Sequence, residues 1–99
     1  MLFSLSVSEE TVRADVLQLA VARTKQECLK AGKPAQICDT LTGSGGNADD
    51  CGGHTCWIAY VYSKNPYDYN ADMYITRDSY GHYVISDFRS GISRPPVNK

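Results

Sequence analysis

Four cysteines carry the most reactive side chains of this chain: Cys28, Cys38, Cys51 and Cys56. Thiols this close together in sequence either pair as disulfides or bind a metal. Of the three possible pairings, we favour the local one, Cys28–Cys38 with Cys51–Cys56. The nested pairing, Cys28–Cys56 with Cys38–Cys51, stays open. Paired cysteines predict an oxidising, extracytoplasmic location, which means the periplasm, the cell surface or secretion.

The alternative chemistry for this cluster is zinc binding. The stretch Cys51-Gly-Gly-His54-Thr-Cys56 places two sulfurs and an imidazole within six residues, and Cys38 would complete a Cys3His set. The spacing departs from the common C-x2-C knuckle, and no C-x-x-C motif is present for thioredoxin-type redox chemistry. We therefore expect no bound metal and no cofactor.

The two histidines, His54 and His82, are the candidates for acid–base catalysis. With Arg77 or Arg89 they would support ribonuclease-like chemistry. They are well separated in sequence, and the chain has neither a G-x-S-x-G nucleophile elbow nor a P-loop. We expect a protein without enzymatic activity. A small ribonuclease-like enzyme using His54 and His82 is kept as an alternative.

Tyrosines are the strongest sign of a binding surface, because all seven lie within residues 60–83. The strand propensity of tyrosine explains several of them, but Tyr67, Tyr69 and Tyr80 lie in or beside predicted turns. Tyrosine offers a large, rigid contact area at low entropic cost. We therefore predict that these three residues contact a protein or glycan partner.

Charge and hydropathy exclude several classes of partner. The chain has 10 basic and 11 acidic residues and a net charge of -1, so no nucleic-acid surface is expected. It contains no run of about 18 apolar residues, so no membrane span is predicted. Residues 1–5 do not make a complete signal peptide. Because disulfide formation requires export, we expect that a targeting or membrane segment has been removed.

A long helix is predicted over residues 9–31. Ser6 or Ser8 would supply its N-cap and Gly32 its end. One apolar stripe runs along its full length and contains Ala14, Leu17, Val21 and Cys28. A second apolar face is confined to the N-terminal half and contains Val12, Val16, Leu19 and Ala20. Either residues 2–7 cover this second face, or it contacts a partner or another subunit, which makes Val12, Val16 and Leu19 candidate partner-binding residues.

The remainder of the chain, taken as one domain over residues 1–99, is expected to be a loop followed by strands. Residues 32–54 are predicted to be a Cys/Gly-rich loop, residues 55–89 a β-meander, and residues 90–99 a tail. Alternating apolar residues place strands at 55–63, 69–77 and 82–89, and residues 2–7 are a short strand or apolar lead-in. The expected fold class is α+β: one long N-terminal helix packed on a three- to four-stranded antiparallel meander, with a disulfide-stapled loop between them.

This order of elements resembles the globular part of a type IV pilin or pseudopilin, and also the small periplasmic pilotins. The resemblance covers roughly Thr11 to Arg89 and includes the helical stretch Val12-Arg-Ala-Asp-Val-Leu-Gln-Leu-Ala20. The prepilin cleavage motif, the apolar N-terminal span and the cystatin motif Q-x-V-x-G are not found in this sequence. The resemblance implies a non-enzymatic extracytoplasmic module that self-assembles or binds a protein partner.

A different interpretation follows from the tyrosines. A small secreted or periplasmic inhibitor, immunity protein or effector would bind one partner enzyme through its Tyr-rich hairpins.

Overall fold

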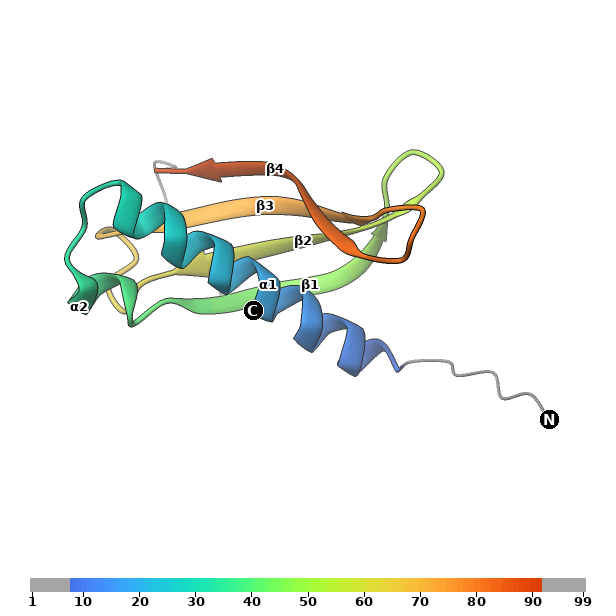
Figure 1. The fold of residues 1–99 in the computed structure, drawn as a ribbon. Coiled ribbons are helices and arrows are strands. Elements are labelled where there is room, and N and C mark those ends of the chain that lie inside the picture. Colours follow the sequence, from blue (N-terminus) through green and yellow to red (C-terminus); the bar gives the residue numbers. More distant parts are fainter. Residues whose placement is uncertain (1–7, 92–99) are drawn as a thin grey trace.

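The computed structural model describes residues 8–91, which form a helix packed on a four-stranded sheet. The helices are α1 (Glu9–Lys30) and α2 (Ala35–Cys38), and the strands are β1 (Thr42–Asp50), β2 (Thr55–Tyr62), β3 (Asn70–Arg77) and β4 (Tyr83–Ser90). The strands form an antiparallel meander in the order β1-β2-β3-β4, and α1 lies obliquely across one face of it (Figure 1). The predicted α+β architecture is confirmed.

α1 is capped at both ends. The Ser8 hydroxyl accepts a hydrogen bond from the Thr11 backbone N–H at 3.2 Å. At the other end, Gly32 has a φ of 84°, and the Lys33 N–H donates to the Cys28 carbonyl at 3.2 Å. This is a Schellman motif, in which glycine takes the left-handed conformation that other residues avoid.

The inner face of the sheet, which α1 covers, is lined with apolar side chains in register. Across β2 and β3 the pairs are Trp57 with Ile75, Ala59 with Met73, and Val61 with Ala71. These residues are buried together with Val16 and Ala20 of α1, neither of which has any exposed surface. Burying a side chain such as Val16 contributes roughly 1.5–3 kcal/mol. The strands predicted at residues 55–63 and 69–77 are confirmed as β2 and β3.

β1 corrects the prediction that residues 32–54 form a loop. Residues 42–50 pair with β2, although their sequence, Thr-Gly-Ser-Gly-Gly-Asn-Ala-Asp-Asp, has low strand propensity. The fourth strand of the sheet therefore comes from this segment. Residues 2–7, expected to be a short strand or lead-in and containing the alternative cap Ser6, lie outside the described residues.

The glycines of β1 let α1 lie directly against the strand. A Cβ atom at Gly43 would stand 3.2 Å from Val21 Cγ2, and a Cβ atom at Gly46 would stand 3.1 Å from Leu17 Cδ2. Gly46 also has a φ of 78°. A side chain at either position would push the helix away from the sheet. The contact with α1 therefore favours glycine here, although glycine has low strand propensity.

The N-terminal helix face of Val12, Val16 and Leu19 packs on the sheet. Val16 is completely buried, and Val12 and Leu19 are partly buried against the same core. Val16 has no exposed surface in this fold, so it is a core residue and offers no contact area to a partner. The partner-binding role of Val12 and Leu19 stays a prediction. Periodicity did not settle the matter, since the N-terminal half of the helix is apolar on two sides.

Gly46→Ala should lower the free energy of unfolding more than Gly52→Ala. Both glycines have positive φ, 78° and 73°, so alanine is strained at both positions by roughly 1–2 kcal/mol. Only at Gly46 would the new Cβ also meet α1, which adds an overpacking cost of roughly 1–3 kcal/mol. Urea denaturation of both variants measures the difference. Equal losses would contradict the close approach of α1 to β1.

Candidate functional site

The meander gathers its loops at two opposite ends of the sheet. Turn 51–54 and hairpin 78–82 lie at one end, the hairpin end, and loop 63–69 lies with α2 at the other, the α2 end (Figure 1). The intervening strands β2 and β3 are each 8 residues long. At about 3.3 Å per residue, the two ends are roughly 25 Å apart.

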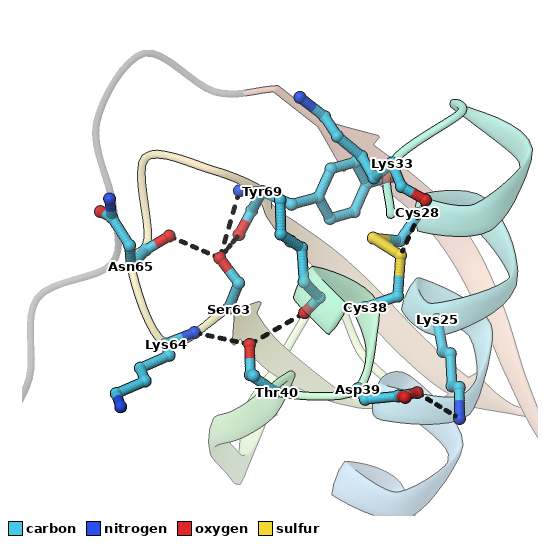
Figure 2. Close-up of a disulfide and its surroundings, with 11 residues drawn as sticks. Lys25, Cys28, Lys33, Cys38, Asp39, Thr40, Ser63, Lys64, Asn65 and Tyr69 are labelled. Carbon is cyan, nitrogen blue, oxygen red and sulfur yellow. Dashed lines mark hydrogen bonds and ion pairs between the residues drawn. A yellow bond between two sulfur atoms is a disulfide. The ribbon is translucent and has the colours of Figure 1, made fainter. Parts of the chain in front are cut away.

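At the α2 end, the Cys28–Cys38 disulfide joins the last turn of α1 to α2, with Cα atoms 5.8 Å apart. The Tyr69 ring lies beside this disulfide (Figure 2), and Tyr69 is only 8% exposed. The predicted partner contact of Tyr69 is wrong, because this residue fills a second small core around the disulfide. Its backbone is also fixed, since the Ser63 N–H donates to the Tyr69 carbonyl at 3.0 Å.

Tyr67 and Tyr80 are exposed, as a partner-binding role requires, but they lie at opposite ends of the sheet. Tyr67 is 76% exposed in loop 63–69, and Tyr80 is 83% exposed in hairpin 78–82. Alternation with buried residues places three other tyrosines on the outer face of the sheet, away from α1: Tyr60, Tyr62 and Tyr74. The cluster of tyrosines in the sequence therefore does not become one surface.

At the hairpin end, the Cys51–Cys56 disulfide closes the turn between β1 and β2. The predicted local pairing is confirmed, and it occupies all four cysteines. The zinc alternative, Cys38 and Cys51 with His54 and Cys56, loses its sulfur ligands because thiolates are required. Within residues 8–91, no group of three or more His, Cys, Asp or Glu residues is placed to hold a metal. Two disulfides indicate an oxidising, extracytoplasmic environment.

Arg77, at the end of β3, is held over two aromatic rings. Its guanidinium carbon lies 4.7 Å from the centroid of the Tyr83 ring and 5.8 Å from that of the Trp57 ring. Its Nη2 donates a hydrogen bond to the Tyr83 hydroxyl, and the Trp57 and Tyr83 rings meet edge to face at 5.4 Å. Stacking and hydrogen bonding together fix the position of the guanidinium.

A shallow depression beside Arg77 joins the two turns of the hairpin end. Its lining consists of His54, Thr55, Trp57, Arg77 and Asp78. His82 lies on the adjoining hairpin, with its Nδ1 3.6 Å from Asp78 Oδ2. The structure thus places both predicted catalytic histidines and Arg77 at one end. Arg89 pairs with Asp72 instead, at 3.3 Å.

Asp78 organises the β3–β4 hairpin. Its Oδ1 accepts hydrogen bonds from the backbone N–H of His82 at 2.8 Å and of Tyr80 at 2.9 Å. The hydrogen bond from the His82 N–H is the main reason that the pKa of the Asp78 carboxyl lies below its usual range, and the Tyr80 N–H and the nearby His82 ring add to it. The charged carboxylate therefore stabilises the folded hairpin.

An apolar groove runs between α1 and β1 and is referred to as the α1–β1 groove. Its lining consists of Ala14, Leu17, Gln18, Val21, Ala22 and Gly43. Leu17 and Val21 are half-buried, whereas Ala14 and Ala22 are exposed. Ala14, Leu17 and Val21 belong to the apolar stripe that the sequence places along the full length of the helix. The sequence does carry one signal for this groove, namely the small residues Ala14 and Ala22, whose side chains leave a hollow and do not fill a core.

None of the helices within residues 8–91 is long and apolar enough to cross a membrane. Comparison with protein-family models finds no matching family. Comparisons with curated proteins and with solved structures find no match either.

Acidification should loosen the β3–β4 hairpin by protonating Asp78. Because the pKa of Asp78 is lower in the folded state, its stabilisation is fully present above the unfolded value, about 3.9, and is lost as the pH falls through the folded value. NMR shifts of the Tyr80 and His82 amide protons, followed from about pH 5 to about pH 2, report this step. Asp78→Asn should remove it. A transition that persists in Asp78→Asn would belong to another group.

Proposed function

We propose that this domain is a non-enzymatic extracytoplasmic assembly subunit, most concretely a type IV pilin- or pseudopilin-like subunit. The order of α1, the disulfide-linked α2 connection and the antiparallel meander supports this proposal, because the pilin resemblance implies the same order. The observation that carries the proposal is the α1–β1 groove. It is an apolar surface that runs along α1 and is open in the part of the chain that the structure describes.

The α1–β1 groove suits the helix of a second copy. Ala14, Ala22 and Gly43 have little or no side chain, so another helix can approach closely and interdigitate with Leu17. Gln18 is the one polar side chain among the lining residues. A helix packed here would remove apolar surface from water, which contributes roughly 25 cal/mol per Å².

The charges along α1 favour a staggered, parallel arrangement of copies. Residues 9–19 carry three acidic residues and one basic residue, a net charge of -2, whereas residues 20–33 carry four basic residues and one acidic residue, a net charge of +3. In a staggered array, the acidic start of one helix lies beside the basic end of its neighbour. Exposed charges of this kind contribute more to orientation and register than to affinity.

Two other functions have less support from the geometry. An inhibitor, immunity or effector role through Tyr-rich hairpins needs Tyr67 and Tyr80 on one surface, but their loops lie at opposite ends of the sheet. For a ribonuclease-like enzyme, His54 and His82 do share the hairpin end. The lack of enzymatic activity stays a prediction, to be checked by RNA turnover in the protein and in its His54→Ala variant.

Gln18→Arg should block self-assembly, whereas Gln26→Arg should not. Both are exposed glutamines on α1, and both substitutions add one positive charge, but only Gln18 lines the α1–β1 groove. A bulky cation in the groove would have to lose its hydration when the second helix packs there. Chemical cross-linking of the full-length protein in the cells that produce it measures assembly, and thermal denaturation checks that both variants fold. Wild-type assembly of Gln18→Arg would exclude the groove as the assembly surface.

A further inference from the structure

The hairpin end presents a fixed guanidinium, that of Arg77, which has no carboxylate partner among residues 8–91. Arg77 is exposed, and none of the ion pairs found within residues 8–91 involves it. A guanidinium has five N–H donors, and Arg77 uses one of them to bind the Tyr83 hydroxyl. The remaining N–H donors form a planar fork that is already positioned, and they are available to a ligand.

Acceptors and smaller polar groups lie in the same depression. Asp78 Oδ1 is occupied by two backbone N–H groups, whereas the polar contact of Oδ2 found within residues 8–91 is the 3.6 Å approach of His82 Nδ1. His54 and Thr55 contribute an imidazole and a hydroxyl from the opposite turn. Among the described lining residues, Arg77 is a cation and Asp78 an anion, so their formal charges cancel.

Both walls of the depression are stiffened before any ligand binds. The Cys51–Cys56 disulfide closes the turn that carries His54, and Asp78 holds its own hairpin through backbone hydrogen bonds. Preorganised polar groups lose little conformational entropy on binding, so a small ligand can be held by few contacts.

We propose that this depression, the Arg77 site, binds a neutral saccharide. Sugar hydroxyls both donate and accept hydrogen bonds, so two neighbouring hydroxyls can accept from the Arg77 fork while one of them donates to Asp78. Trp57 lines the depression, and Tyr80 on the adjoining hairpin is 83% exposed, so we expect these two rings to offer aromatic surface to the apolar C–H face of a sugar.

The surrounding charges favour a neutral ligand over an anionic one. Asp78 lines the site itself, and further carboxylates line two neighbouring hollows. Asp49 and Asp50 lie in a hollow that shares His54 and Thr55, and Glu9 and Glu10 lie in one that shares Trp57. A phosphate-rich polymer or an acidic sugar would meet these charges, and Arg77 is the one permanent cation among the described residues that line the depression.

Titration with free sugars tests the proposal, with detection through Trp57, the single tryptophan of the chain. Glucose, galactose and N-acetylglucosamine are the probes, and glucuronate and inorganic phosphate are the anionic comparisons. We expect a saturable change in fluorescence with at least one neutral sugar. Arg77→Lys keeps the charge but loses the planar fork, and it should weaken binding about tenfold or more. The matched variant Arg89→Lys, at a residue that pairs with Asp72, should bind as the wild type does.

Three results would overturn the proposal. The first is a stronger response to phosphate or glucuronate than to the neutral sugars, which would make this an anion site. The second is no saturable response to any of the three sugars. The third is equal binding by Arg77→Lys and the wild type. The Arg77 site and the α1–β1 groove have no lining residue in common, so these results are independent of the assembly experiment.

Discussion

The close approach of α1 to the glycines of β1 determines how the rest of the domain is arranged. Gly43 and Gly46 present no side chain, so Leu17 and Val21 of α1 lie directly against this strand. With the helix this close, Val16 reaches the inner face of β2 and β3 and is completely buried there. Larger residues in β1 would lift the helix and leave a void beneath it, which close-packed interiors do not tolerate.

The same packing separates two surfaces with different chemistry. Because α1 buries its Val16 and Ala20 side, its small residues Ala14 and Ala22 remain open in the α1–β1 groove. The far end of α1 is anchored by the Schellman motif and the Cys28–Cys38 disulfide, so the helix has little freedom to rotate. The polar groups that line the Arg77 depression lie instead at the hairpin end. A subunit could therefore assemble through one surface while the other stays accessible.

Much of the fold could be predicted because several local signals agree with the tertiary structure. Helix caps and a terminal glycine mark where α1 begins and ends, and period-two alternation locates β2, β3 and β4. Short sequence separation favours the observed disulfides. β1 could not be predicted, because its glycines have low strand propensity. They fit this strand because they let the neighbouring helix approach closely. The two sides of α1 could not be ranked, since both are apolar and only the shape of the sheet distinguishes them.

The site was harder to predict than the fold because exposure depends on distant residues. Tyr67 and Tyr69 share one loop, but Tyr69 is buried against a disulfide formed by residues far away in sequence, whereas Tyr67 faces solvent. Residue type alone does not distinguish the two. The grouping of His54 with Arg77 likewise follows from the meander, which brings alternate turns to the same end of the sheet. Neither pattern is visible in local sequence.

The most direct test of this account compares Ala20→Asp with Ala22→Asp by equilibrium denaturation. The two alanines are in the middle of the same helix, so the intrinsic helix cost of aspartate is similar at both positions. Ala20 has no exposed surface and Ala22 is exposed. An unpaired charge buried at Ala20 should cost several kcal/mol, a large part of the roughly 5–15 kcal/mol that stabilises a small domain. We predict that Ala20→Asp unfolds or nearly unfolds the protein, while Ala22→Asp keeps its fold. Equal losses, or a larger loss at Ala22, would show that α1 packs on the sheet through its other face.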